Sequence, residues 1–167
     1  MEANEVIKLL NLVPHPEEGG FFIETYRSSE FIAKESLPNR YDAKRSFGTC
    51  IYYFLTPETF SKIHKLKSDE IFHFYLGDPV EMVNLYQDGS GQMLTIGNDI
   101  KNGMLPQVIV KKDIWQGARL KDGGKFALLG TTVAPSFEFI DYETGKRDFL
   151  LKNYPNFKDI IVKLTSE

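Results

Sequence analysis

The chain has 167 residues, a formal net charge of −3 and a single cysteine, Cys50. Its length fits one domain, residues 1–167, that buries a core without disulfides, and the lone cysteine excludes both an intrachain disulfide and a cysteine-based zinc site while suiting a reducing compartment. Because lysine and arginine are spread along the chain, neither a nucleic acid nor a membrane is favoured as a partner.

The N-terminal residues predict a short one-sided helix over residues 2–12. Its apolar side chains recur at helical spacing, at Val6, Leu9, Leu10 and Val13. Pro14 ends the helix because it lacks a backbone N–H donor, and the following HPEEGG segment is predicted as a surface loop that carries His15. Acidic residues stand where a signal peptide would have a basic start, and no apolar run is long enough to span a membrane. We therefore expect a soluble, cytoplasmic protein.

Aromatic and β-branched residues predict a strand over Phe21–Arg27. Strict alternation places Glu24 and Arg27 on opposite faces of this strand. Residues 28–45 are charged and lack a sustained period, which favours a surface connection, with a mobile flap over a pocket as the alternative. The segment Thr49–Leu55 is apolar on both faces, so we expect it to be central in a sheet.

Strand signals then recur along the chain, separated by short turns rich in glycine, aspartate and asparagine. The predicted strands are 60–66, 70–76, 80–86, 93–96, 107–110, 115–120, 126–133 and 137–142. Short strands without helical crossovers predict an all-β antiparallel sandwich or barrel over about residues 20–142 and exclude a parallel α/β sheet. The apolar spacing of residues 147–164, broken at Pro155, predicts two short helices packed outside the β-structure.

The stretch FSKIHKLKSDEIFHFYLG, residues 60–77, is the predicted centre of the chemistry because it holds two histidines, His64 and His73. Histidine exchanges protons and binds metals near neutral pH, and a nearby carboxylate can orient its ring. A carboxylate inside a barrel needs a partner, and His64 is the obvious partner for Glu70. Alternation from Glu70 puts His73 on the opposite face unless a β-bulge rotates it inward.

These residues resemble the first motif of the cupins, which runs His, any residue, His, three or four residues, Glu, six residues, Gly. His64, Leu66 in the place of the second His, Glu70 and Gly77 fit that frame. The blocks HPEEGGFF, IYYFL, FSKIHKLKSDEIFHFYLGDP, LPQVIVKKDIW and TTVAPSF are similar to a branch of small single-domain cupins, called cupin type five, whose activity is largely unassigned. Together they cover most of residues 10–142.

The resemblance implies a double-stranded β-helix, or jelly-roll barrel, commonly dimeric, with a pocket at its mouth that His64 faces. In the second cupin motif Gln116 takes the place of the histidine. Leu66 and Gln116 therefore replace two of the usual four metal ligands, three His and one Glu. A divalent metal, if one binds, would be held by His64, Glu70 and Gln116; no other cofactor is implied.

The sequence leaves three functions open. It also leaves open whether the chain is an enzyme. The first is metal-independent epimerase-like or isomerase-like action on a sugar, nucleotide-sugar or similar polar metabolite, with His64 as the base and Glu70 as its orienter. The second is a metal-dependent oxygenase, isomerase or lyase with a reduced ligand set. The third is a non-catalytic module that binds a small molecule.

The predicted pocket wall combines cations for an anionic group with aromatic rings for stacking on a sugar or a base. The predicted ligand-binding residues are Arg27, Tyr53, Lys62, Phe72, His73, Trp115 and Gln116. The strand Phe21–Arg27 is apolar enough to pair with a second chain at a sheet edge, so we expect a homodimer.

Overall fold

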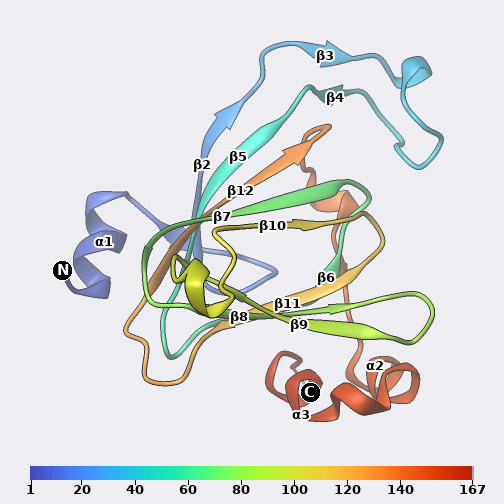
Figure 1. The fold of residues 1–167 in the computed structure, drawn as a ribbon. Helices are drawn as coiled ribbons and strands as arrows, with labels where there is room; N and C mark the ends of the chain where they lie inside the picture. Colours follow the sequence, from blue (N-terminus) through green and yellow to red (C-terminus); the bar gives the residue numbers. More distant parts are fainter. Residues whose placement is uncertain (167) are drawn as a thin grey trace.

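The computed structural model describes residues 1–166, which form two facing antiparallel sheets (Figure 1). The larger sheet has the strand order β1 (Val13–Pro14), β2 (Phe21–Arg27), β5 (Thr49–Leu55), β12 (Ala127–Ala134), β7 (Asp69–Gly77) and β10 (Gln107–Val110). The smaller sheet has the order β13 (Glu143–Thr144), β6 (Phe60–Lys65), β11 (Trp115–Leu120), β8 (Val80–Leu85) and β9 (Gly91–Ile96). These short antiparallel strands confirm the predicted all-β class, and β5 is central in its sheet as expected.

The space between the sheets is divided into a packed half and a hollow half. In the packed half, inward side chains of β5, β7 and β12 such as Tyr53, Phe72 and Leu129 are buried in one apolar cluster. Farther along the same three strands, the inward positions carry Thr49, Glu70 and Thr131 and line a cavity instead. Because inward side chains alternate along each strand, one row of positions supplies both the core and the cavity wall.

Three helices pack on the outside of the sheets, as predicted. Helix α1 (Ala3–Leu9) begins with a capping box between Glu2 and Glu5, and its Val6 packs with Phe54 on the outer face of the larger sheet. Helices α2 (Arg147–Asn153) and α3 (Lys158–Lys163), joined by the 3₁₀ turn η4 (Pro155–Phe157), cover the outer face of the smaller sheet (Figure 1). Among the described residues, no helix has the length and apolarity needed to cross a membrane.

The strand predicted over residues 137–142 is absent, and a 3₁₀ turn, η3 (Phe139–Asp141), takes its place. Strand β12, which precedes it, is already paired on both sides, with β5 and with β7. The chain therefore crosses to the other sheet, where only β13 pairs, with β6. A buried ion pair between Asp141 and Arg45, at 2.8 Å, holds this crossing in place.

Residues 28–48 form an arm that extends from the larger sheet (Figure 1). The arm contains two short paired strands, β3 (Phe31–Ile32) and β4 (Arg45–Ser46), and the 3₁₀ turn η1 (Lys34–Ser36). Its Tyr41 is fully buried and makes a 2.7 Å hydrogen bond with Ser68. The burial of Tyr41 and its hydrogen bond favour the predicted surface connection over the mobile flap. Outside the arm, a further 3₁₀ turn, η2 (Ile100–Asn102), lies between β9 and β10.

Candidate functional site

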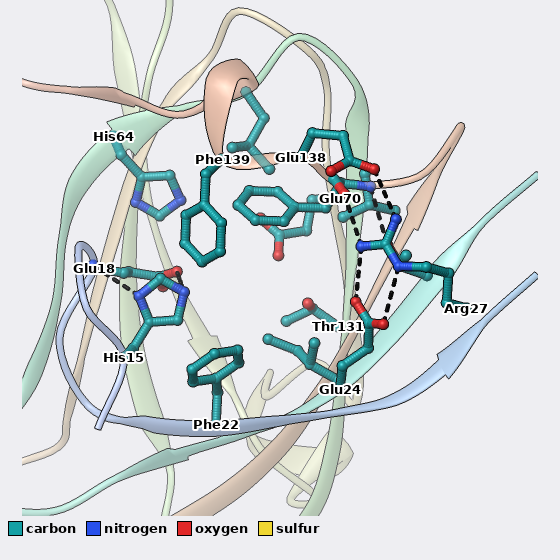
Figure 2. Close-up of a pocket in the computed structure, with 15 residues that line it drawn as sticks. His15, Glu18, Phe22, Glu24, Arg27, His64, Glu70, Thr131, Glu138 and Phe139 are labelled. Atoms are coloured by element: carbon teal, nitrogen blue, oxygen red, sulfur yellow. Dashed lines mark hydrogen bonds and ion pairs between the residues drawn. The ribbon is translucent and has the colours of Figure 1, made fainter. Parts of the chain in front are cut away.

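The hollow half of the barrel encloses a cavity of about 80 Å³ between the two sheets (Figure 2). Strands β2, β5, β6, β7 and β12 supply most of its wall, and the loop before β2 and the crossing after β12 supply the rest. The lining residues are His15, Glu18, Phe22, Glu24, Arg27, Thr49, Ile51, His64, Leu66, Glu70, Thr131, Val133, Phe137, Glu138 and Phe139. None of residues 28–48 is among them.

His64 reaches the cavity from β6, on the same face as Leu66, and its side chain is buried. Its Nδ1 lies 2.7 Å from the backbone carbonyl oxygen of Lys62. A carbonyl only accepts hydrogen bonds, so Nδ1 carries the proton and Nε2 keeps its lone pair. Burial lowers the pKa of His64, with nearby Glu70 opposing that shift, so the ring is neutral at pH 7. The ring of Tyr142 stacks on it at 4.6 Å.

Glu70 enters the cavity from β7 and is also buried. The Nε2 of Gln116 donates a 2.6 Å hydrogen bond to its Oε2. Burial and the neighbouring carboxylate of Glu18 raise the pKa of Glu70 to about 7, against the opposing effects of His64 and the hydrogen bond from Gln116. Near neutral pH, Glu70 is therefore protonated in part of the molecules and ionised in the rest.

A second histidine, His15, enters the same cavity, although the sequence predicted it on the surface. The backbone N–H groups of Glu17 and Glu18 donate to its Nδ1, at 3.3 and 2.9 Å. Nδ1 therefore accepts, and the proton of the neutral ring lies on Nε2. Burial lowers the pKa of His15.

Glu18 accompanies His15 from the same loop, and its carboxyl group is buried. The Oγ of Ser61 donates to its Oε1, while its Oε2 lies 4.0 Å from His15 Nε2. Burial raises the pKa of Glu18. In β6 an extra residue relative to β11 separates Ser61 from His64, so both side chains turn inward.

The loop of His15 is buried because its two glycines bring the backbone against the barrel. A Cβ on Gly19 would lie 2.4 Å from the carbonyl oxygen of Phe60, and both Gly19 and Gly20 have positive φ angles, +97° and +69°. The Tyr53 hydroxyl donates a 2.8 Å hydrogen bond to the Gly19 carbonyl oxygen. The consecutive glycines after HPEE were the only sequence signal of this close approach.

Arg27 lines the cavity on the same side as Glu24, which corrects the predicted alternation. A β-bulge between Glu24 and Tyr26 inserts one residue relative to β5, so Phe22, Glu24 and Arg27 all face inward. Arg27 donates to Glu24 at 3.0 and 2.9 Å, to Glu138 at 2.7 Å and to the carbonyl of Phe137 at 3.2 Å (Figure 2). Its charge is thus matched by two carboxylates rather than held ready for an anionic ligand.

The structure does not bring the other predicted ligand-binding residues to the cavity wall. Tyr53 and Phe72 belong to the apolar core, and Trp115 packs beside the C-terminal helices. His73 lies on the outer face of the larger sheet, where its Nε2 is 3.2 Å from Thr132 Oγ1. Lys62 lines a separate surface groove with Lys146, and its backbone contacts the site, through its carbonyl to His64 and through its N–H to the Glu18 carbonyl at 2.9 Å.

Gln116 lies behind Glu70 rather than in the cavity wall. Its Nε2 donates to Glu70, while its buried Oε1 has no hydrogen-bond partner among the described residues. Leu66 offers no donor atom. Within residues 1–166, no three His, Cys, Asp or Glu side chains are grouped so that they could hold a metal ion. Of the predicted metal ligands, His64 and Glu70 line the cavity and Gln116 does not, and one imidazole with one carboxylate does not fit the divalent metal that the cupin motifs imply.

Comparison with known proteins identifies the family of this chain. A family model described as "Cupin superfamily (DUF985)" matches residues 4–145. The uncharacterized protein YML079W of Saccharomyces cerevisiae is 30% identical over 158 residues, which cover 89% of this chain and 78% of that protein. A crystal structure of protein SO0799 from Shewanella oneidensis is 30% identical, covers 99% of this chain and 98% of that one, and superposes with a TM-score of 0.87.

More distant solved structures share the fold alone. Oxalate decarboxylase from Bacillus subtilis is 12% identical with a TM-score of 0.55, covering 93% of this chain and 37% of that one. A dTDP sugar isomerase from Desulfovibrio desulfuricans is 14% identical with a TM-score of 0.51, covering 82% and 80%. Both likenesses support the jelly-roll fold. The match over residues 4–145 shows that the chain belongs to the cupin superfamily, in its DUF985 family.

Proposed function

We propose that this cupin is a metal-independent enzyme that moves a proton on a small polar molecule, with His64 as the base. The observation that carries the proposal is the bond between His64 Nδ1 and the Lys62 carbonyl, which leaves the Nε2 lone pair for the cavity. A base whose tautomer is fixed in this way needs no rearrangement before it accepts a proton.

Glu70 suits the role of partner to this base. When His64 accepts a proton, the imidazolium is attracted to the carboxylate of Glu70, which raises the proton affinity of the ring. The pKa of about 7 places Glu70 where it can also return a proton near neutral pH. Apolar side chains such as Phe22 and Phe139 complete the wall and strengthen these electrostatic interactions by excluding water.

The size of the cavity limits what can react there. At about 80 Å³ it is smaller than the roughly 150 Å³ engineered cavity that takes up benzene. Only a group of a few heavy atoms fits between His64 and Glu70, and any larger part of a substrate must extend beyond the rim. A sugar or a small hydroxylated metabolite therefore suits the cavity better than a whole nucleotide-sugar.

Solvent deuterium exchange tests the proposal whatever product the reaction forms. The wild-type protein is incubated in D₂O with neutral sugars, hydroxyaldehydes, hydroxy acids and amino acids, and ¹H NMR detects loss of a carbon-bound proton. The base is then removed by His64→Asn, because the asparagine amide N–H can still donate to the Lys62 carbonyl while the Nε2 acceptor is lost. We expect exchange to fall by about 100-fold or more.

The matched control is His73→Asn, which makes the same change on the outer face of the larger sheet and should leave exchange unaltered. A folded His64→Asn variant that exchanges as fast as the wild type would contradict the role of His64.

We also propose that the chain forms a homodimer through the outer face of the larger sheet. Tyr26, Tyr75 and Ile109 lie on this face and are 55%, 52% and 52% exposed. Tyr75 and Ile109 lie on the neighbouring strands β7 and β10, and Tyr26 lies on β2. Apolar side chains at this level of exposure on one face of a sheet are typical of a surface that a partner covers. Light scattering at micromolar concentration should give twice the chain mass, and a monomer mass would refute the dimer.

A further inference from the structure

The two histidines of the cavity differ in their Nε2 atoms, one of which accepts hydrogen bonds while the other donates. His64 Nδ1 donates to a backbone carbonyl, so its Nε2 accepts; His15 Nδ1 accepts from two backbone N–H groups, so its Nε2 donates. Both rings point into the cavity in Figure 2. The 4.0 Å between His15 Nε2 and Glu18 Oε2 is too long for a hydrogen bond, so this N–H is not taken up by the carboxyl group.

We propose that His15 is a second catalytic residue, which donates its Nε2–H to the carbonyl oxygen of a small uncharged hydroxycarbonyl compound while His64 accepts a proton from the adjacent carbon. This inference rests on the proposed function and goes beyond it by assigning a second residue and a substrate class. A neutral imidazole suits this role because it stabilises a developing oxyanion without first having to bind a proton itself.

The charges around the cavity argue for an uncharged ligand. The carboxyl groups of Glu18 and Glu70 are buried in its wall, and a second pair, Glu24 and Glu138, lies at the rim. Arg27 is the one lysine or arginine among the described lining residues, and both rim carboxylates bind it. A carboxylate or phosphate on the ligand would lose its hydration beside like charges without gaining a free cation.

The proton transfer balances within the cavity. The bond between hydrogen and the carbon next to the carbonyl breaks, the proton goes to His64 Nε2, and the electron pair moves through the new carbon–carbon double bond to the carbonyl oxygen. His15 Nε2–H donates a hydrogen bond to that oxygen as its negative charge develops. Return of the proton from His64 to the same carbon gives epimerisation or solvent exchange, and delivery to the neighbouring carbon, with the hydroxyl proton passing to the first oxygen, gives aldose–ketose isomerisation.

The loop offers a selective variant, His15→Asn. Its Oδ1 can still accept from the backbone N–H groups of residues 17 and 18, so the loop keeps its cap, but the Nε2–H donor is lost. A second variant, His15→Gln, places an amide N–H near the position of Nε2 and should recover part of the lost function. Far-UV circular dichroism and thermal unfolding establish that each variant is folded.

The experiment measures deuterium exchange by ¹H NMR for glycolaldehyde, dihydroxyacetone and erythrulose, with glycolate and dihydroxyacetone phosphate as anionic counterparts. We expect exchange of at least one uncharged compound and of neither anion, a loss of about 100-fold in His15→Asn, the size found for one oxyanion donor, and partial recovery in His15→Gln.

Wild-type exchange rates in folded His15→Asn, or His64-dependent exchange of the anions alone, would overturn the inference and leave the proposed function standing. Absence of exchange for every compound, in this panel and in the wider one used for His64, would overturn both.

Discussion

The cavity holds two imidazole–carboxylate pairs, one borne by strands and one by a loop, and they are built by different means. His64 and Glu70 are fixed by the alternation of β6 and β7 and by hydrogen bonds from the sheet. His15 and Glu18 are fixed by backbone N–H groups of their own turn and by glycines that let the loop approach the barrel. The strand pair therefore depends on regular geometry, and the loop pair depends on tight packing.

This difference sets what each pair contributes. The tautomer of His64 follows from a carbonyl that lies two residues back in its own strand, and that of His15 from N–H groups two and three residues ahead. One pair thus offers an acceptor and the other a donor, although both contain the same side-chain types. Changes that act on one pair alone can test this division.

The largest expected effect concerns Glu70 in the strand pair. Its pKa is raised from 4.5 to about 7 in the folded protein, so folding favours the protonated form. The resulting stabilisation is complete below about pH 4.5 and is lost as the pH rises through about 7. At about 1.4 kcal/mol per unit of pKa, this loss is on the order of 3 kcal/mol.

The variant Glu70→Gln removes this titration and keeps an acceptor for the Gln116 amide. Urea unfolding at pH 4.5 and pH 8 measures the free energy of unfolding of both proteins. Relative to the wild type, the variant should be about 3 kcal/mol more stable at pH 8 than at pH 4.5. The pKa of Glu18 is raised in the same direction, and its carboxylate interacts with that of Glu70, so the difference between the two proteins measures the titration of Glu70 together with this interaction. An unchanged difference between the two proteins at both pH values would show that Glu70 is not buried as described.

The loop pair should be broken by Gly19→Ala. The new Cβ would clash with the Phe60 carbonyl oxygen at 2.4 Å, at a φ of +97°. The matched control is Gly123→Ala, which has a φ of +86° but nothing within 4 Å of a Cβ. The control should cost about 1 kcal/mol from backbone strain alone, and Gly19→Ala about 2 kcal/mol more, measured by urea unfolding. Equal costs would mean that the loop is not packed against the barrel.

The smallest effect is expected at the rim, where Glu138 helps to neutralise Arg27. Glu138→Gln removes one of the two negative charges beside Arg27 and should strengthen binding of glycolate by about two- to fivefold, the range of an exposed ion pair. An NMR titration measures this affinity. Glu143→Gln, which removes an ion pair with Lys65 outside the cavity, is the control. Equal affinities in the two variants would show that Arg27 does not govern selection against anions.

Much of the fold was predictable because short-range patterns determine it. The strands β2 and β5 have the predicted bounds, since aromatic and β-branched runs ended by Pro, Gly or charged residues leave little choice of where a strand begins and ends. The segment 137–142 was predicted as a strand because strand signals recur along this part of the chain, but β12 has no free edge there. Such local signals report a tendency, and only the sheet order decides whether a partner strand is available.

The site was predictable only where the strands are regular. Alternation correctly places His64 beside Leu66 and turns His73 to the outer face. It fails at Arg27, because a β-bulge leaves no clear trace in the sequence FFIETYR. It says nothing of His15, whose burial depends on the approach of Gly19 and Gly20 to strands that are distant in the sequence.

The tautomers of the two cavity histidines are tested most directly by ¹⁵N NMR of the imidazole nitrogens at neutral pH, with assignments from the His64→Asn and His15→Asn variants. We expect His64 to be protonated at Nδ1, with Nε2 as the acceptor, and His15 to be protonated at Nε2. A proton on Nε2 of His64 would remove the base from the cavity and contradict the proposed chemistry.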